Sequence, residues 1–159
     1  MNKKLPYGRH YVDEDDIQSV VNVLREGNLT QGPVVEQFEE KIAKYVGAKY
    51  AVAVSSCTAG LHLSCLALGL KKNEIALTSP ISFVSSANCA SFVGAQLDFV
   101  DIDSETINLS VDQLEHSLNE GKQVDLIIPV HFAGYPVDME RLSLLAKIYK
   151  FHIIEDAAH

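Results

Sequence analysis

Residues 124–155 read VDLIIPVHFAGYPVDMERLSLLAKIYKFHIIE, and their pattern sets the fold class. The stretch begins with an apolar segment at 124–130 and ends with another at 151–155, both of which predict strands. Between them, apolar residues recur at helical spacing over 137–149. Two strands joined by a helix are parallel, and their nearly continuous apolar character is typical of a sheet that is covered on both faces.

The same alternation runs back along the chain. Further strands are expected at 50–56, 74–79 and 96–102, followed by helices at 57–69, 82–93 and 110–120. Two helices come first, at 13–24 and 32–47, and the second is opened by Pro33 and closed by Gly47. We therefore expect an α/β fold with a mostly parallel sheet and helices on both faces.

Size and composition narrow the classes of function. The chain has 159 residues, 47% of them hydrophobic, and a formal net charge of -8. This acidity argues against a nucleic-acid or anionic-membrane surface, and no apolar run reaches the roughly 18 residues of a spanning helix. We expect a cytoplasmic protein that acts on small molecules.

The three cysteines (Cys57, Cys65 and Cys89) form no C-x-x-C pair, which favours reduced thiols over a disulfide framework or a zinc site.

The last predicted strand, 151–155, is followed by only four residues, whereas every earlier strand is followed by a helix. The pattern predicts that this chain is the N-terminal part of a longer protein. A natural terminal strand is the alternative.

Ligands of open parallel sheets bind beyond the carboxyl ends of the strands, so the residues that follow each strand are candidates for a site. Ser55, Ser56 and Thr58 surround the start of the helix at Cys57, where free N–H groups favour an anion such as a phosphate. An ordinary Ser or Thr N-cap explains the same residues equally well.

Three more candidates follow other strands. Phe83 is predicted at a helix start, where its ring is either a stacking platform for a flat ligand or part of the core. Asp156 ends an apolar strand, where a carboxylate requires a hydrogen-bonding or cationic partner, unless it caps a following helix. His131 is either a donor to a ligand-binding group or a structural histidine.

Taken together, these residues place a phosphate site, a ring platform and an anchored carboxylate along one edge of the sheet. That combination suits a flat, phosphorylated, protonatable heterocycle, and pyridoxal 5'-phosphate (PLP) has these properties. Its phosphate would lie at the helix terminus, and its pyridine nitrogen would need a carboxylate, Asp156, to stay protonated.

Four long blocks of the chain resemble the DegT/DnrJ/EryC1/StrS family of sugar aminotransferases, which have the aspartate-aminotransferase (type I) PLP fold. They are LTQGPVVEQFEEKIAKYVGAKYAVAVSSCTAGLHL (29–63), LTSPISFVSSANCASFVGAQLDFVDID (77–103), IIPVHFAGYPVDM (127–139) and IIEDAAH (153–159). Two shorter blocks, PYGRHYVDEDDI (6–17) and SPISFVSSAN (79–88), most resemble the branch that aminates UDP-4-keto-6-deoxy-N-acetylaltrosamine toward pseudaminic acid.

The resemblance implies a role for each site residue. Thr58 and Ala59 would hold the PLP phosphate, Phe83 would stack on the ring, and Asp156 would pair with the pyridine nitrogen. His159 stands where the family commonly has Gln, in contact with the phenolic oxygen. No catalytic residue is expected in this chain, because the family's Schiff-base lysine would lie beyond His159.

The resemblance also implies the domain organisation and the reaction. Residues 1–159 would be an incomplete PLP-binding large domain, with an N-terminal helical segment at 1–47 and an α/β core at 48–159; the rest of the large domain and a C-terminal small domain would be absent. The full-length enzyme would transfer an amino group from glutamate to a UDP-linked 4-keto-6-deoxy sugar, as a homodimer, in the synthesis of cell-surface polysaccharide.

Other functions fit the residues less well. A nucleotide-binding oxidoreductase lacks its G-x-G-x-x-G motif here, and a cysteine phosphatase would need Arg where Leu63 stands. A PLP-dependent sugar dehydratase relative and a non-catalytic fragment that binds a sugar nucleotide stay open.

Overall fold

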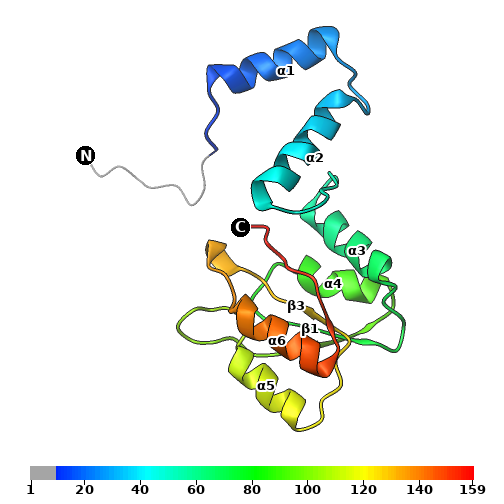
Figure 1. Cartoon of the computed structure of the whole chain (residues 1–159), viewed down its shortest axis with the longest axis vertical. Coiled ribbons are helices and arrows are strands. Elements are labelled where there is room, and N and C mark those ends of the chain that lie inside the picture. The colour runs from blue at the N-terminus through cyan, green and yellow to red at the C-terminus, as the bar shows by residue number, and fades with distance from the viewer. Residues whose placement is uncertain (1–9) are drawn as a thin grey trace, which may run out of the picture. The chain divides into compact units, whose positions relative to one another are not determined.

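The computed structural model describes residues 10–159, so residues 6–9 of the block PYGRHYVDEDDI lie outside it. The chain forms two compact units that divide between Ala53 and Val54. Both units are drawn in Figure 1. Within residues 10–159, no helix combines the length and the apolarity needed to cross a bilayer.

The first unit contains two helices, α1 (Glu14–Glu26) and α2 (Pro33–Val46). Helix α1 begins with a capping box in which Asp13 and Asp16 each accept the backbone N–H of the other. Helix α2 begins at Pro33 and ends at Gly47, whose φ of 72° is a left-handed conformation that glycine adopts without strain. The helices predicted at 13–24 and 32–47 are confirmed.

The second unit is the α/β part of the chain. Its elements in order are α3 (Cys57–Leu68), β1 (Ile75–Thr78), α4 (Ser85–Phe92), β2 (Gln96–Phe99), α5 (Val111–Asn119), β3 (Leu126–Ile128), a 3-10 turn (Phe132–Gly134), α6 (Met139–Tyr149) and β4 (His152–Ile153). The four strands form one parallel sheet in the order β2-β1-β3-β4. The predicted α/β class with a parallel sheet is confirmed.

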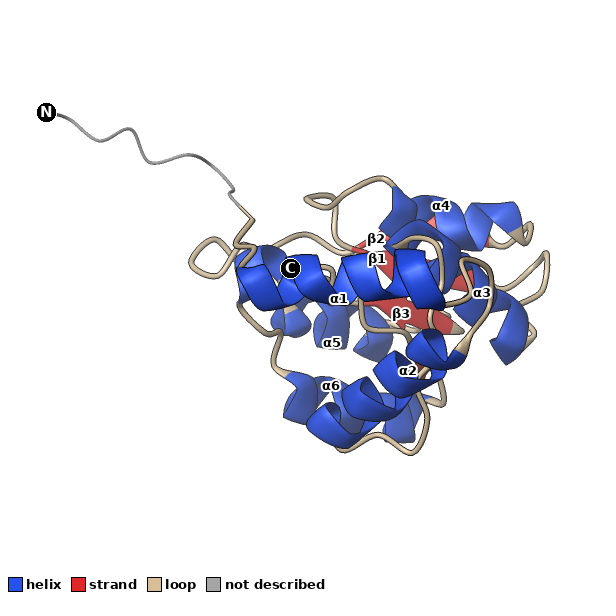
Figure 2. Cartoon of the chain, turned by 90° about the horizontal axis from the view of Figure 1, so that it is seen from above, coloured by secondary structure: helices blue, strands red, loops and turns tan. Residues whose placement is uncertain are grey.

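Alternate residues of the strands belong to two different hydrophobic clusters. Figure 2 shows the strands β1, β2 and β3 of the sheet and the helices of this unit. On one face, Ala76 and Ile128 pack in a cluster with Leu61 and Cys65 of α3 and with Cys89 of α4. On the other face, the cluster contains Leu77, Ile127, Leu114 and Leu118 of α5, and Leu142 and Leu145 of α6. The two central strands, β1 and β3, are therefore buried on both sides, as their apolar sequence predicts, whereas the edge strand β2 is largely exposed.

The prediction of a strand at 50–56 is wrong, since these residues form no β-ladder with any strand of residues 10–159. Tyr50, Val52 and Val54 are exposed. An apolar alternating segment becomes a strand only where a neighbouring backbone supplies hydrogen bonds, and propensity does not supply that partner. The helix predicted to begin at 82 also begins later, at Ser85, because Ser82 and Phe83 belong to a turn.

Candidate functional site

The candidate site lies at the carboxyl edge of the sheet, which we define as the edge where β1 ends at Thr78 and β3 at Ile128. These two strands are neighbours, and the Thr78 hydroxyl donates a hydrogen bond to the carbonyl of Ile128 over 2.8 Å. The chain leaves β1 toward β2 on one side and returns to β3 on the other. Such a reversal of strand order is where parallel sheets bind ligands.

Asp156 lies at this edge, just beyond β4. Its backbone continues the ladder, with its N–H donating to Pro129 over 2.9 Å and its carbonyl accepting from His131 over 3.1 Å. The residue is only 3% exposed. The extended backbone after β4 therefore carries a carboxylate into the interior of the unit.

Three donors surround the Asp156 carboxylate. Its Oδ2 atom accepts from the Ser86 hydroxyl at 2.5 Å, and its Oδ1 atom accepts from the Cys57 thiol at 3.6 Å and from the Ala158 N–H at 3.3 Å. All three donors are neutral, and no cationic side chain of residues 10–159 forms an ion pair with Asp156. A buried carboxylate held only by neutral donors suits a cationic ligand.

The Cys57 thiol is a hydrogen-bond donor at this site. Desolvation raises its pKa above the ordinary value, and the nearby negative charge and hydrogen bond of Asp156 raise the pKa further. A nucleophilic cysteine requires the opposite shift, because the thiolate is the reactive species. Cys57 therefore acts as a hydrogen-bond donor to Asp156 and not as a nucleophile. The two residues are too far apart in the chain for a sequence pattern to indicate this contact.

The N-terminus of α3 lies next to Asp156 because Cys57 is the first residue of this helix. The N-cap is Ser56, whose hydroxyl accepts the N–H of Ala59 at 3.1 Å. Thr58 therefore has no capping role, and the N–H of Ala59 is already occupied. The first N–H groups of a helix have no acceptor within the helix, so those of Cys57 and Thr58 suit an anion.

Phe83 lies in the turn that leads into α4 and is 74% exposed, so it does not belong to the core. It borders a cavity of about 200 Å³ that is also lined by Thr78, Ser79, Val84 and Phe99. An exposed ring beside a hollow at the carboxyl edge is consistent with a stacking platform.

His131 lies in the loop after β3 and contacts the protein through both ring nitrogens. Its Nδ1 atom accepts the N–H of Val137 at 3.2 Å, and its Nε2 atom lies 3.0 Å from a carboxylate oxygen of Glu155. Both ring nitrogens are thus satisfied within the protein, which makes His131 a structural residue that ties the loop to the end of β4.

His159 has one ring nitrogen in use. Its Nδ1 atom accepts the N–H of Ala133 at 3.1 Å, which places the proton of the neutral ring on Nε2. The ring also packs edge-on against Phe132, with centroids 6.0 Å apart. The Nε2–H group is therefore a donor for a ligand atom.

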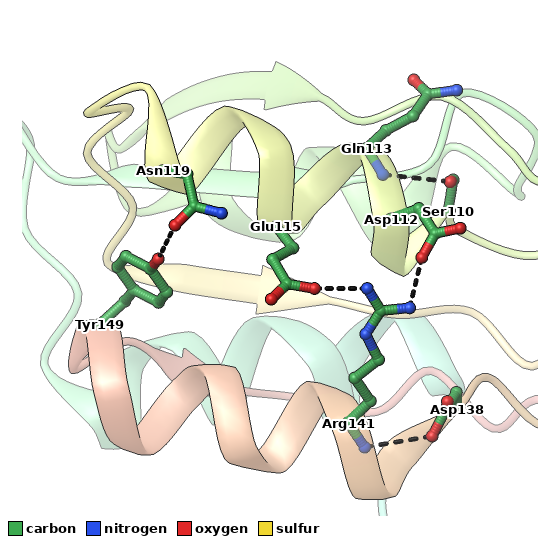
Figure 3. A network of polar contacts seen from close by, with 8 residues as sticks. All are labelled: Ser110, Asp112, Gln113, Glu115, Asn119, Asp138, Arg141 and Tyr149. Atoms are coloured by element: carbon green, nitrogen blue, oxygen red, sulfur yellow. Dashed lines mark hydrogen bonds and ion pairs between the residues drawn. The ribbon is translucent and has the colours of Figure 1, made fainter.

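A second polar cluster lies between α5 and α6 and is structural (Figure 3). Arg141 of α6 pairs with Asp112 and Glu115 of α5, and the Tyr149 hydroxyl donates to Asn119 at 2.6 Å. An adjoining cavity of about 430 Å³ contains none of the predicted cofactor residues. Because the Arg141 guanidinium is already paired, we do not place the site there.

The residues at the carboxyl edge fit PLP by the chemistry of their donors and acceptors. A buried carboxylate without a cationic partner suits a protonated pyridine nitrogen, and the N-terminus of α3 next to it suits a phosphate. The structure brings Asp156 together with α3, which carries Thr58 and Ala59. Ser86 of α4 also contacts Asp156, and sequence reasoning missed it.

The fold is that of the type I PLP-dependent aminotransferases. The aminotransferase from Psychrobacter cryohalolentis superposes with a TM-score of 0.85 at 27% identity, covering 94% of this chain and 38% of that chain. NtdA from Bacillus subtilis with bound cofactor PMP has a TM-score of 0.83 at 31% identity, covering 92% of this chain and 34% of that one.

A family model assigns residues 10–159 to the DegT/DnrJ/EryC1/StrS aminotransferase family, and the chain belongs to this family. Aminotransferases of the family use PLP. Among the relatives is UDP-4-amino-4-deoxy-L-arabinose–oxoglutarate aminotransferase from Shewanella sediminis, 40% identical over 158 residues. Spore coat polysaccharide biosynthesis protein SpsC from Bacillus subtilis has the same identity over the same length. In both cases 99% of this chain is covered, and the chain spans 40% of the relative's length.

Proposed function

We propose that the carboxyl edge binds PLP in the full-length protein. Asp156 would accept a hydrogen bond from the protonated pyridine nitrogen, and the Thr58 hydroxyl with the N-terminus of α3 would bind the phosphate. Phe83 would lie against the ring, and the Nε2–H group of His159 would donate to the phenolic oxygen. Ala59 would contribute to the phosphate site through its position, since its N–H already donates to Ser56.

The observation that carries this proposal is the environment of Asp156. The side chain is 3% exposed, is held by neutral donors only, and lies beside a helix N-terminus. A negative charge in that setting is stabilised further by a cationic partner. When bound, PLP supplies an electron sink that allows an amino group to move between glutamate and a carbonyl compound. Asp156 would keep the proton on the pyridine nitrogen, on which that property depends.

We propose further that the acceptor is a nucleotide-linked 4-keto-6-deoxy sugar, that the nucleotide is UDP, and that the active protein is a homodimer. A relative whose name specifies a UDP-linked amino sugar and oxoglutarate supports this substrate class. A second relative, named for spore coat polysaccharide biosynthesis, supports a role in making surface polysaccharide. The motif SPISFVSSAN (79–88) favours the pseudaminic acid branch within this class. Residues 1–159 would then be part of the large, PLP-binding domain.

The test uses the full-length protein with PLP, glutamate and a UDP-linked keto sugar. We expect 2-oxoglutarate to be released in proportion to the aminated sugar nucleotide, as measured by a coupled assay and mass spectrometry. The altrosamine-derived 4-keto sugar should be preferred over UDP-4-keto-arabinose. Formation of a deoxygenated sugar that carries no new amino group, with the nitrogen of glutamate released as ammonia, would support a dehydratase instead. Binding of the sugar nucleotide without turnover would support a non-catalytic protein.

A further inference from the structure

The hydroxyl of Ser86 is completely buried and contacts three polar groups. Two of these groups belong to the turn before α4, and the third is the side chain of Asp156, just beyond β4. The Ser86 hydroxyl lies 2.5 Å from Oδ2 of Asp156, 2.5 Å from the hydroxyl of Ser82 and 3.1 Å from the carbonyl of Phe83. A serine hydroxyl can donate only one hydrogen but can accept more than one. The three contacts therefore compete for the single hydrogen of Ser86.

The identities of the partners resolve this competition. The Asp156 carboxylate and the Phe83 carbonyl both only accept, but the bond to the ionised carboxylate is charge-assisted and shorter, so the hydrogen of Ser86 points to Asp156. Ser86 then accepts from Ser82, whose hydroxyl also lies 3.1 Å from the carbonyl of Phe83. The hydrogens therefore run in one direction, from Ser82 to Ser86 to Asp156.

The other carboxylate oxygen is held separately. Oδ1 of Asp156 accepts from the Cys57 thiol and from the N–H of Ala158, while Oδ2 accepts from Ser86. Donors on both oxygens oppose rotation of the carboxylate about its bond to Cβ. Of these donors, Ser86 makes the shortest contact and comes from a different element than Cys57.

We propose that Ser82 and Ser86, which we call the serine relay, are positioning residues that fix the Asp156 carboxylate for the ring nitrogen of PLP. This inference rests on the proposed function. The relay shares one turn with Phe83, whose carbonyl lies between the two serines. One short segment, 82–86, therefore sets both the ring platform and the orientation of the carboxylate.

The experiment uses full-length protein loaded with PLP that carries ¹⁵N in its ring. The ¹⁵N chemical shift reports the protonation and hydrogen bonding of the ring nitrogen, and a titration gives the Kd for PLP. Ser86→Ala should move the shift toward that of an unprotonated ring. It should also weaken PLP binding by roughly 10- to 150-fold, as loss of one hydrogen bond to a charged group implies. Ser82→Ala should shift both readouts in the same direction by a smaller amount.

Two control variants separate positioning from packing. Ser86→Thr keeps the hydroxyl and should restore the wild-type ¹⁵N shift. Ser85→Ala changes the neighbouring residue of the same helix, also buried, which has no hydrogen bond to Asp156. Ser85→Ala should therefore leave the ¹⁵N shift, the Kd and the turnover unchanged.

Each other outcome overturns the inference. If wild-type protein holds a protonated ring and Ser86→Ala holds the same ring with the same Kd, the relay is wrong while the proposed function stands. Ser82 is less buried than Ser86, so Ser82→Ala should fold even if Ser86→Ala does not. In that case, an unchanged ¹⁵N shift in Ser82→Ala overturns the relay. If wild-type protein does not bind PLP at all, both proposals fall.

Discussion

The side chain of Asp156 is held in place before any ligand arrives. Its three donors come from α3, from α4 and from the backbone that follows it. A carboxylate that is fixed in this way can receive a cation without reorganising, which is the general advantage of a preorganised electrostatic site.

We predict that Asp156→Asn in the full-length protein lowers the turnover of transamination by orders of magnitude, because a neutral amide cannot keep the ring nitrogen protonated. The asparagine has the same size, so circular dichroism and the melting temperature should show an intact fold. Turnover near the wild-type value, measured as glutamate-dependent formation of 2-oxoglutarate, would contradict the role of Asp156.

Thr58 and Ser56 should respond differently to loss of their hydroxyls. Thr58→Val should weaken PLP binding by about 1.5 to 3 kcal/mol, the value of a hydrogen bond to a charged group. The stability of the fold should change little, because Ser56 caps α3 and Thr58 does not. Ser56→Ala should instead lower the free energy of unfolding by about 1 kcal/mol. A cofactor titration and a urea unfolding curve for each variant measure both quantities. Unchanged PLP affinity in Thr58→Val would show that its hydroxyl does not meet the phosphate.

The site residues differ in how far the sequence could predict them. Asp156 could be predicted because a carboxylate directly after an apolar strand is costly to bury and therefore needs a partner. The exposure of Phe83 could not be predicted, because an aromatic residue near a helix start has the same sequence pattern whether its ring is exposed or buried in the core. Ser86 was missed because serines are common at helix starts, and only the tertiary contact across 70 residues of chain reveals its partner.

At the scale of elements, the helices were easier to predict than the strands. Helices α1, α2 and α3 carry their own end signals, such as Asp13, Pro33 and the left-handed Gly69. A strand needs a partner backbone, so the apolar segment 50–56 has the pattern of a strand and forms none. The parallel direction of strands β1 to β4 could be predicted from the alternation of strands and helices. Their order in the sheet, β2-β1-β3-β4, could not.

The turn between β2 and α5 should depend on pH through Asp103. Its Oδ1 atom accepts the N–H groups of Glu105 and Thr106 and the Thr106 hydroxyl, at 3.1, 2.9 and 3.0 Å. These bonds, those of Thr106 first, hold the pKa of Asp103 below its ordinary value. A lowered pKa means that the stabilisation is complete above the unfolded-state pKa of about 3.9 and is lost as the pH falls through the lower folded-state pKa.

We therefore expect hydrogen exchange of the Thr106 amide, measured by NMR, to lose protection as the pH is lowered below about 4, after correction for the intrinsic exchange rate. Asp103→Asn keeps an oxygen acceptor but does not titrate, so its protection should not change across this range. Equal acid sensitivity in the two proteins would show that another group controls the turn.

At the scale of the whole molecule, two lysines of the α/β unit lie away from the carboxyl edge. Lys71 and Lys150 line a cavity with Glu74, Asp125 and His152, at the beginnings of β1, β3 and β4. Lys122 forms an ion pair with Asp98 over 2.8 Å.

We predict that a protein made only of residues 1–159 binds PLP covalently at no single lysine. After incubation with PLP and reduction with borohydride, peptide mass spectrometry should find weak labelling spread over several surface lysines. The full-length protein, treated in parallel, is the positive control. Stoichiometric labelling of one lysine in residues 1–159, with glutamate-dependent turnover, would show that the active site lies elsewhere.

The order of strands in the sheet determines which parts of the unit can fold first while the chain is being translated. Strand β1 leaves the ribosome well before its central neighbour, because Ala76 pairs with Leu126, 50 positions later. The pair β1 and β2 can form early, with α4 beside it. Asp156 is 99 positions from Cys57 and 70 from Ser86, so these residues can meet only after nearly the whole of this stretch has been translated. We expect nascent chains arrested before residue 156 to hold the hydroxyl of Ser86 without its final acceptor, and the carboxyl edge to be the last part of this unit to become rigid.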